Sequence, residues 1–180
     1  MIPAAVLLTL ATPVAATCPA ASADADVLAG TIEPHRALRQ ELGVALPDAP
    51  VRVLIYSEGG HLATTRISIV AVRNAGGRWR TDAVGRSRIW VKDAPPSDMP
   101  HLARTLSAED SRAVDVILAD PDLWRETSSP IGHVEPPPLD HVSRDVAVFT
   151  PGCVRRGSTG NLALPLLIRL DRLLTPEVRR

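Results

Sequence analysis

A run of segments rich in β-branched residues, separated by short glycine-containing turns, fills residues 51–92 and most constrains the fold. It begins with residues 51–57 (VRVLIYS), continues through Gly59-Gly60, and resumes at residues 64–74 (TTRISIVAVRN). In the second segment apolar and polar positions alternate, as they do in an antiparallel strand with one buried face and one wet face. The pattern therefore predicts a β-hairpin at the centre of the protein.

Further turn signals extend this hairpin into a meander. Residues 74–77 (NAGG) predict a hairpin loop that leads into a strand at residues 78–84, and Gly85 permits a bend before another strand at residues 86–92. Residues 93–101 (DAPPSDMPH) contain three prolines, which cannot donate hydrogen bonds within a sheet. We therefore expect about four strands, with the run ending near residue 93.

Helix signals flank the meander. Residues 33–43 contain an early proline and end at a glycine, residues 107–119 begin with a capping serine, and a leucine-rich helix is expected from Pro165. Residues 145–150 predict one more strand, whereas residues 128–143 hold four prolines and predict a loop. The expected fold class is α+β: an antiparallel β-meander of four to five strands packed on one face by two to three helices.

Composition fits one globular domain. The chain has 180 residues, of which 45% are apolar and 22% charged, so it lies far from the regime of intrinsic disorder. Lys plus Arg and Asp plus Glu both number 20, so no net field attracts nucleic acid or an anionic membrane. Aromatic residues make up only 3% of the chain, which disfavours stacking platforms for single-stranded nucleic acid.

The N-terminal residues 1–16 have the pattern of a signal peptide. They contain no charged side chain, include an apolar run from residue 4 to residue 11, and end in Val-Ala-Ala. That run is too short to span a membrane. We predict export to the periplasm or the medium of a bacterium, a flexible segment at residues 17–30, and a single domain at residues 31–180; the alternative is an N-terminal core helix that stays attached.

The two cysteines of the chain are Cys18 and Cys153. Cleavage after residue 16 places Cys18 second in the mature chain, where an oxidising compartment favours a disulfide with Cys153. A lipoprotein signal requires cleavage directly before the cysteine, and Thr17 at that place disfavours lipidation. The alternatives to the disulfide are a lipidated Cys18 or two unpaired thiols.

Potential metal ligands occur within the proline-rich loop. They are His133, Glu135, Asp140 and His141. Imidazole and carboxylate groups suit zinc or a similar ion, but the spacing matches no metal signature. The alternative interpretation is a set of ordinary polar loop residues, and no cofactor is predicted.

Signals for nucleophilic catalysis are weak. Ser57, Glu58 and His61 lie close together in the sequence, and Ser158 and Thr159 occupy a turn, but neither group forms a G-x-S-x-G motif. Glycine-rich phosphate-binding motifs are also absent from the sequence. We therefore predict no catalytic residue.

The charge pattern that stands out is basic. Five arginines of the meander form the candidate ligand-binding set: Arg66, Arg78, Arg80, Arg86 and Arg88. Arginine offers paired donors to carboxylate and phosphate, so an acidic protein or an anionic envelope polymer is the expected partner, and nucleic acid is not. The sequence thus favours a non-catalytic envelope binding or accessory module. The alternatives are a solvated outer sheet face and a metal-dependent or hydrolytic enzyme that uses the loop from His133 to His141.

Overall fold

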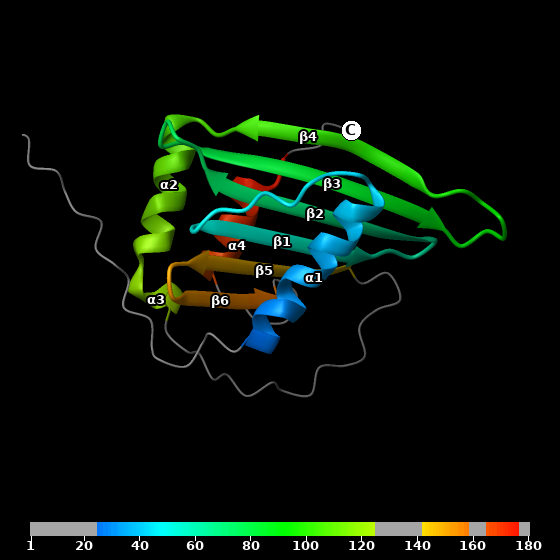
Figure 1. The fold of residues 1–180 in the computed structure, drawn as a ribbon, viewed down its shortest axis with the longest axis horizontal. Helices are drawn as coiled ribbons and strands as arrows, with labels where there is room; N and C mark the ends of the chain where they lie inside the picture. The colour runs from blue at the N-terminus through cyan, green and yellow to red at the C-terminus, as the bar shows by residue number, and fades with distance from the viewer. Residues whose placement is uncertain (1–24, 125–141, 159–164, 177–180) are drawn as a thin grey trace, which may run out of the picture.

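The structure, a computed structural model, describes residues 25–124, 142–158 and 165–176. A six-stranded sheet lies at its centre, with α1 in front of the sheet and α4 behind it (Figure 1). In chain order the elements are α1 (Ala25–Glu41), β1 (Arg52–Gly59), β2 (Ala63–Arg73), β3 (Trp79–Ile89), β4 (Ser97–Thr105), α2 (Ala108–Ala119), α3 (Pro121–Trp124), β5 (Val142–Thr150), β6 (Cys153–Ser158) and α4 (Pro165–Leu174).

The strands run in the order β4-β3-β2-β1-β5-β6, and each neighbouring pair is antiparallel. An antiparallel meander is present as predicted, and its strands β1 to β4 follow one another across four of the six strands. Its strands differ from the prediction: residues 78–84 and 86–92 belong to one strand, β3, and β4 lies beyond the predicted end near residue 93. After α2 and α3 the chain returns to the free side of β1, where β5 pairs along the whole of β1. β4 and β6 are consequently the edge strands.

The register divides the side chains of the sheet between two faces. Leu54 pairs with Val70 and with Ala147, so these three side chains share the face covered by α1. Their neighbours, including Val53 and Val148, point to the other face, which packs against α2, α3 and α4. The second face contains the larger hydrophobic cluster.

The α2 helix confirms its predicted signals. Ser107 is the N-cap, and its Oγ accepts a hydrogen bond of 3.0 Å from the backbone N–H of Asp110. Asp120 ends the helix, and the following turn, α3, buries Trp124 as the sequence suggests. In α4 the predicted leucine stripe is buried through Leu167, Leu170 and Leu174.

The described residues contain more elements than we predicted. The sheet has six strands rather than four or five, four helices are present, and helices cover both faces rather than one. Strands lie at two places where none was predicted: β4 in the segment that contains three prolines, and β6, which includes Arg155 and Arg156. An edge strand tolerates such charges, since one side of it faces solvent.

Two strand boundaries also differ from the prediction. β3 runs straight through Gly85, where we expected a bend, and the missing side chain instead lets β4 approach: a Cβ at this position would lie 2.6 Å from the Met99 Sδ. β4 itself contains Pro100, although its prolines predicted the end of the sheet. Pro100 is tolerated because β4 is an edge strand and the register shifts between Ala83 and Gly85.

Two elements begin earlier than expected. α1 begins at Ala25, inside the segment predicted to be flexible, and therefore carries Pro34 in its interior rather than in its first turn. β5 begins at Val142, at the end of the predicted loop. Among the described helices, none is both long enough and apolar enough to cross a membrane.

Candidate functional site

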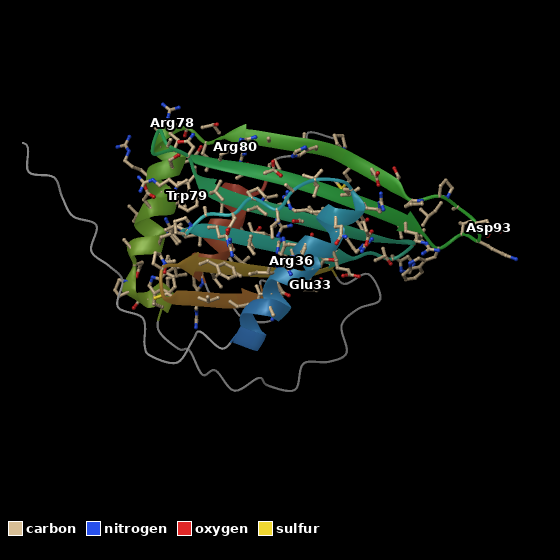
Figure 2. The ribbon with its side chains drawn as sticks, viewed as in Figure 1. Glu33, Arg36, Arg78, Trp79, Arg80 and Asp93 are labelled. Atoms are coloured by element: carbon tan, nitrogen blue, oxygen red, sulfur yellow. The ribbon has the colours of Figure 1, made fainter. Side chains whose placement is uncertain are left out.

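The predicted arginines divide into separate groups on the sheet. Arg66 pairs directly with Arg86 in the β2–β3 register, and Arg80 and Arg88 lie on the same face of β3, which is the face that α1 covers. Arg78 precedes β3 at the end of the molecule next to α2, where Figure 2 also shows Arg80. The structure therefore brings four of the five onto one face but spreads them along its length.

Ion pairs neutralise the middle of this face. The Arg66 guanidinium contacts the Glu41 carboxylate at 2.6 Å, and Arg86 contacts Asp98 at 2.6 Å and Glu41 at 3.4 Å. The hydrogen bond from Arg66 holds the pKa of Glu41 below its ordinary value. Arg66 and Arg86 thus already have carboxylate partners within the chain.

A buried polar network lies beneath α1. Arg39, 1% exposed, donates from Nη1 to Asp82 Oδ1 and from Nη2 to the Asp82 carbonyl oxygen, both at 2.8 Å. Its Nε donates to Ser68 Oγ at 2.9 Å, and the same Oγ is 2.8 Å from Nδ1 of His35, which is 2% exposed. On the outer side, His101 Nε2 lies 2.8 Å from Asp82 Oδ2.

Burial and partners determine the charges in this network. Burial, reinforced by the Arg39 cation, lowers the pKa of His35 to about 3, so its imidazole is neutral. Burial alone would raise the pKa of Asp82, but hydrogen bonds from Arg39 and His101 outweigh it and hold that pKa below its ordinary value. Asp82 is therefore a carboxylate that compensates the buried arginine.

The network contains serine, histidine and aspartate, which are common catalytic residues, but their contacts are not those of a catalytic site. The Ser68 side chain is fully buried, and its Oγ is engaged by both His35 and Arg39, so it is not available as a nucleophile. The Asp82 carboxylate contacts His101 rather than His35, so serine, histidine and aspartate do not form one relay. The network instead fixes α1 on the sheet through directional bonds.

The group Ser57, Glu58 and His61 does not assemble. Ser57 and Glu58 are adjacent in β1 and therefore point to opposite faces of the sheet. Glu58 accepts a hydrogen bond from the Tyr56 hydroxyl at 3.1 Å, and His61 is exposed in the turn after β1. Ser57 is buried within β1, so the three side chains do not meet in one site.

Several other predicted residues lie outside the described residues. These are His133, Glu135, Asp140, His141 and Cys18. Within the described ranges no group of three or more histidine, cysteine, aspartate or glutamate side chains has the geometry of a metal site. Cys153 is described: it is buried as the first residue of β6 and belongs to the larger hydrophobic cluster. The disulfide stays a prediction.

A groove of about 620 Å³ lies between the loop before β1 and the β5–β6 turn. Arg52 lies over the Phe149 ring, with its guanidinium carbon 5.0 Å from the ring centroid, and forms an ion pair with Asp48. The Arg52 cation is thus already paired with the Asp48 carboxylate. The described side chains that line the groove form no pair of nucleophile and base.

An apolar tip, which the sequence reasoning missed, lies at the end of the sheet away from α2. We define the tip as Leu62 in the β1–β2 turn together with Ile89, Trp90 and Val91 at the end of β3. All four side chains are strongly exposed, with Trp90 66% exposed. The backbone N–H of Trp90 donates to the Leu62 carbonyl oxygen at 3.1 Å, which joins the turn to the β3–β4 loop.

The charges around the tip balance. Arg88 and Lys92 flank Trp90 and form no ion pair with a described residue, while Glu58 and Asp93 supply two carboxylates at the same end of the sheet. The β3–β4 loop extends beyond the other strand ends, with Asp93 at its extremity (Figures 1 and 2). The tip is therefore a protruding apolar surface with no net charge.

The sequence contains a signal for this tip. Residues 89–91 (IWV) are three consecutive apolar residues at a strand end, directly before Lys92-Asp93 and two prolines. Because successive side chains of a strand point to opposite faces, three consecutive apolar residues cannot all share one buried face.

Comparison with known proteins finds no matching family model, no matching curated sequence and no matching solved structure.

Proposed function

We propose that this chain is a non-catalytic binding module of the cell envelope, and that the apolar tip is its contact surface. The observation that carries the proposal is the exposure of Leu62, Ile89, Trp90 and Val91 at one end of the sheet, in the β1–β2 turn and where β3 leads into the protruding β3–β4 loop. Exposed apolar clusters mark interaction sites, because leaving such surface in water is unfavourable. Tryptophan is also among the residues that most often dominate binding energies.

The distribution of basic residues favours the tip as the contact surface over the centre of the arginine face, by which we mean the side of the sheet that carries Arg66, Arg80, Arg86 and Arg88. Arg78 and Arg80 lie near α2, whereas Arg88 and Lys92 lie beside the tip, and the arginines between them are ion-paired. On this face, an acidic protein or anionic polymer would therefore find the described bases that lack carboxylate partners at the two ends. At the tip, bases coincide with a cluster of exposed apolar side chains, as they do in binding hot spots.

Photo-crosslinking tests the proposal. A photoreactive residue placed at position 62 of the exported protein in its native cell should give a discrete adduct. Val116 on α2 is the matched control, because it is as exposed as Trp90, at 66%, but lies at the opposite end of the sheet. Adducts from both positions alike, or from neither, would overturn the tip as a contact surface.

The envelope location is a separate part of the proposal and has its own measurement. The intact mass of protein recovered from the native cell should match a chain that begins at Thr17 and lacks two hydrogens, because Cys18 and Cys153 are expected to pair in an oxidising compartment. A chain that retains Met1 and both thiols would contradict export, and an added acyl mass would replace the disulfide with lipidation.

A further inference from the structure

We infer that the apolar tip inserts into the boundary between headgroups and acyl chains of a phospholipid bilayer. This inference rests on the proposed function, since it names the partner of the same surface. Three features of the tip carry it: the arrangement of its apolar side chains, the balance of its charges and the internal hydrogen bonds of three of its donors.

The apolar side chains of the tip do not form one flat face. Trp90 lies on the side of the sheet that α1 covers, because its Nε1 contacts Thr64 on that face, whereas Ile89 lies on the opposite side. A flat protein surface contacts only one of these sides at a time. A fluid apolar phase surrounds both without shape complementarity, so the arrangement favours lipid over a flat protein partner.

The charges of the tip favour neither an anionic nor a cationic partner. Arg88 and Lys92 are matched in number by Glu58 and Asp93, so steering by net charge is absent at this end. Lysine and arginine have long aliphatic stems that lie along apolar surface while their charged ends remain in the aqueous headgroup region. The Asp93 carboxylate at the extremity of the loop limits insertion to that region, because an unpaired carboxylate is costly to bury. The expected binding therefore depends on apolar insertion and is insensitive to salt.

Three hydrogen-bond donors of the tip and its loop have acceptors within the protein. The Trp90 indole N–H donates to Thr64 Oγ1 at 2.9 Å, and the backbone N–H of Ala94 donates to the Val91 carbonyl oxygen at 3.2 Å. Together with the bond from Trp90 to Leu62, these contacts remove donors that would otherwise lose water on insertion. Tryptophan is also enriched at membrane interfaces.

Binding to zwitterionic phosphatidylcholine vesicles tests the inference. The parent protein should co-sediment weakly and reversibly, and its fluorescence should shift to the blue, because Trp79 and Trp124 are buried and Trp90 is exposed. The double variant Trp90→Ser/Val91→Ser should bind at least about tenfold more weakly, since it removes the largest apolar area. Val116→Ser, the matched control, should bind like the parent, and raising the salt should change nothing.

Each outcome separates the inference from the proposed function. Absence of vesicle binding, or equal binding of the parent and the tip variant, overturns lipid insertion. If position 62 nevertheless crosslinks to a protein, the binding module stands with a protein partner; if it crosslinks to nothing, both fall. Salt-sensitive binding to anionic vesicles alone also overturns insertion and assigns the contact to the arginine face. Circular dichroism of each variant establishes that the sheet is intact.

Discussion

The two faces of the sheet are covered in different ways. On one face, α2, α3 and α4 pack through aliphatic side chains and Trp79, which form one continuous cluster. On the other face, α1 lies over a much smaller apolar cluster and is held by Arg39, Asp82, Ser68 and His35. One face thus depends on non-directional burial, and the other on a set of directional bonds around a buried charge.

This difference determines what each face tolerates. Apolar clusters accept changes of shape that preserve volume, because no bond angle has to be reproduced. A buried ion pair accepts little, because removing one partner leaves the other charge without compensation in a medium of low polarity. We therefore expect the α1 face to specify one helix position and the opposite face to supply most of the burial.

The largest effect should come from breaking the ion pair. Arg39→Leu leaves the Asp82 carboxylate beneath α1 with His101 as its remaining partner and should lower the free energy of unfolding by about 3–5 kcal/mol. The double variant Arg39→Leu/Asp82→Leu should recover much of the loss, because it leaves no buried charge. Urea unfolding of both variants measures this, and equal losses in the two would contradict the coupling.

A substitution on the opposite face should reveal its tolerance. Leu170→Ala creates a cavity in the larger cluster and should cost about 3 kcal/mol, whereas Leu170→Met should cost less than about 1.5 kcal/mol. The equally conservative Arg39→Lys should cost more than Leu170→Met, because lysine does not reproduce the forked guanidinium contacts with Asp82 and Ser68. If both conservative changes cost the same, the two faces do not differ as we describe.

Acid should destabilise the α1 face selectively. The folded-state pKa of His35, about 3, lies below its ordinary value of 6.5, so the unfolded chain binds the proton more readily. Stability is therefore full above about pH 6.5 and should fall by about 2 kcal/mol by pH 5. The lowered pKa of Asp82 adds loss only below the ordinary carboxyl range. His35→Asn, which retains a group able to bond Ser68, should flatten the slope measured by urea unfolding.

The smallest effect should come from the exposed ion pairs. Glu41→Gln removes the carboxylate shared by Arg66 and Arg86 at the surface and should cost under about 1 kcal/mol. The cost should shrink further as salt is added, because exposed charges are screened. A loss as large as that of Arg39→Leu would mean that the surface pairs, rather than the buried network, hold α1.

Much of the apolar face was predictable from the sequence. The alternation in residues 64–74 and the leucine stripe from Pro165 both follow from burial on a single side, and periodicity reports such burial directly. The α2 helix was predictable for another reason: Ser107 and Asp120-Pro121 act locally and do not depend on distant residues.

The α1 face was not predictable in the same way. The polarity of Arg39 and His35 indicates exposure, although their spacing places them on the helix face of Leu38. Both are buried because partners far away in the sequence lie opposite them, Asp82 for Arg39 and Ser68 for His35. The one available signal was that Asp82 is the single acid among the arginines between residues 66 and 88. Likewise Pro100 was assigned to a loop, because only the sheet order identifies its strand as an edge.

That edge has a consequence for how copies of the protein meet. Pro100 removes one backbone donor from the middle of β4, and the register shift opposite Gly85 disrupts the regular spacing of the others. A strand from a second molecule would therefore meet an interrupted hydrogen-bonding row and could not extend the sheet along its full length. The protein can thus expose an apolar tip at one end without offering its longest free strand as a template for fibril growth.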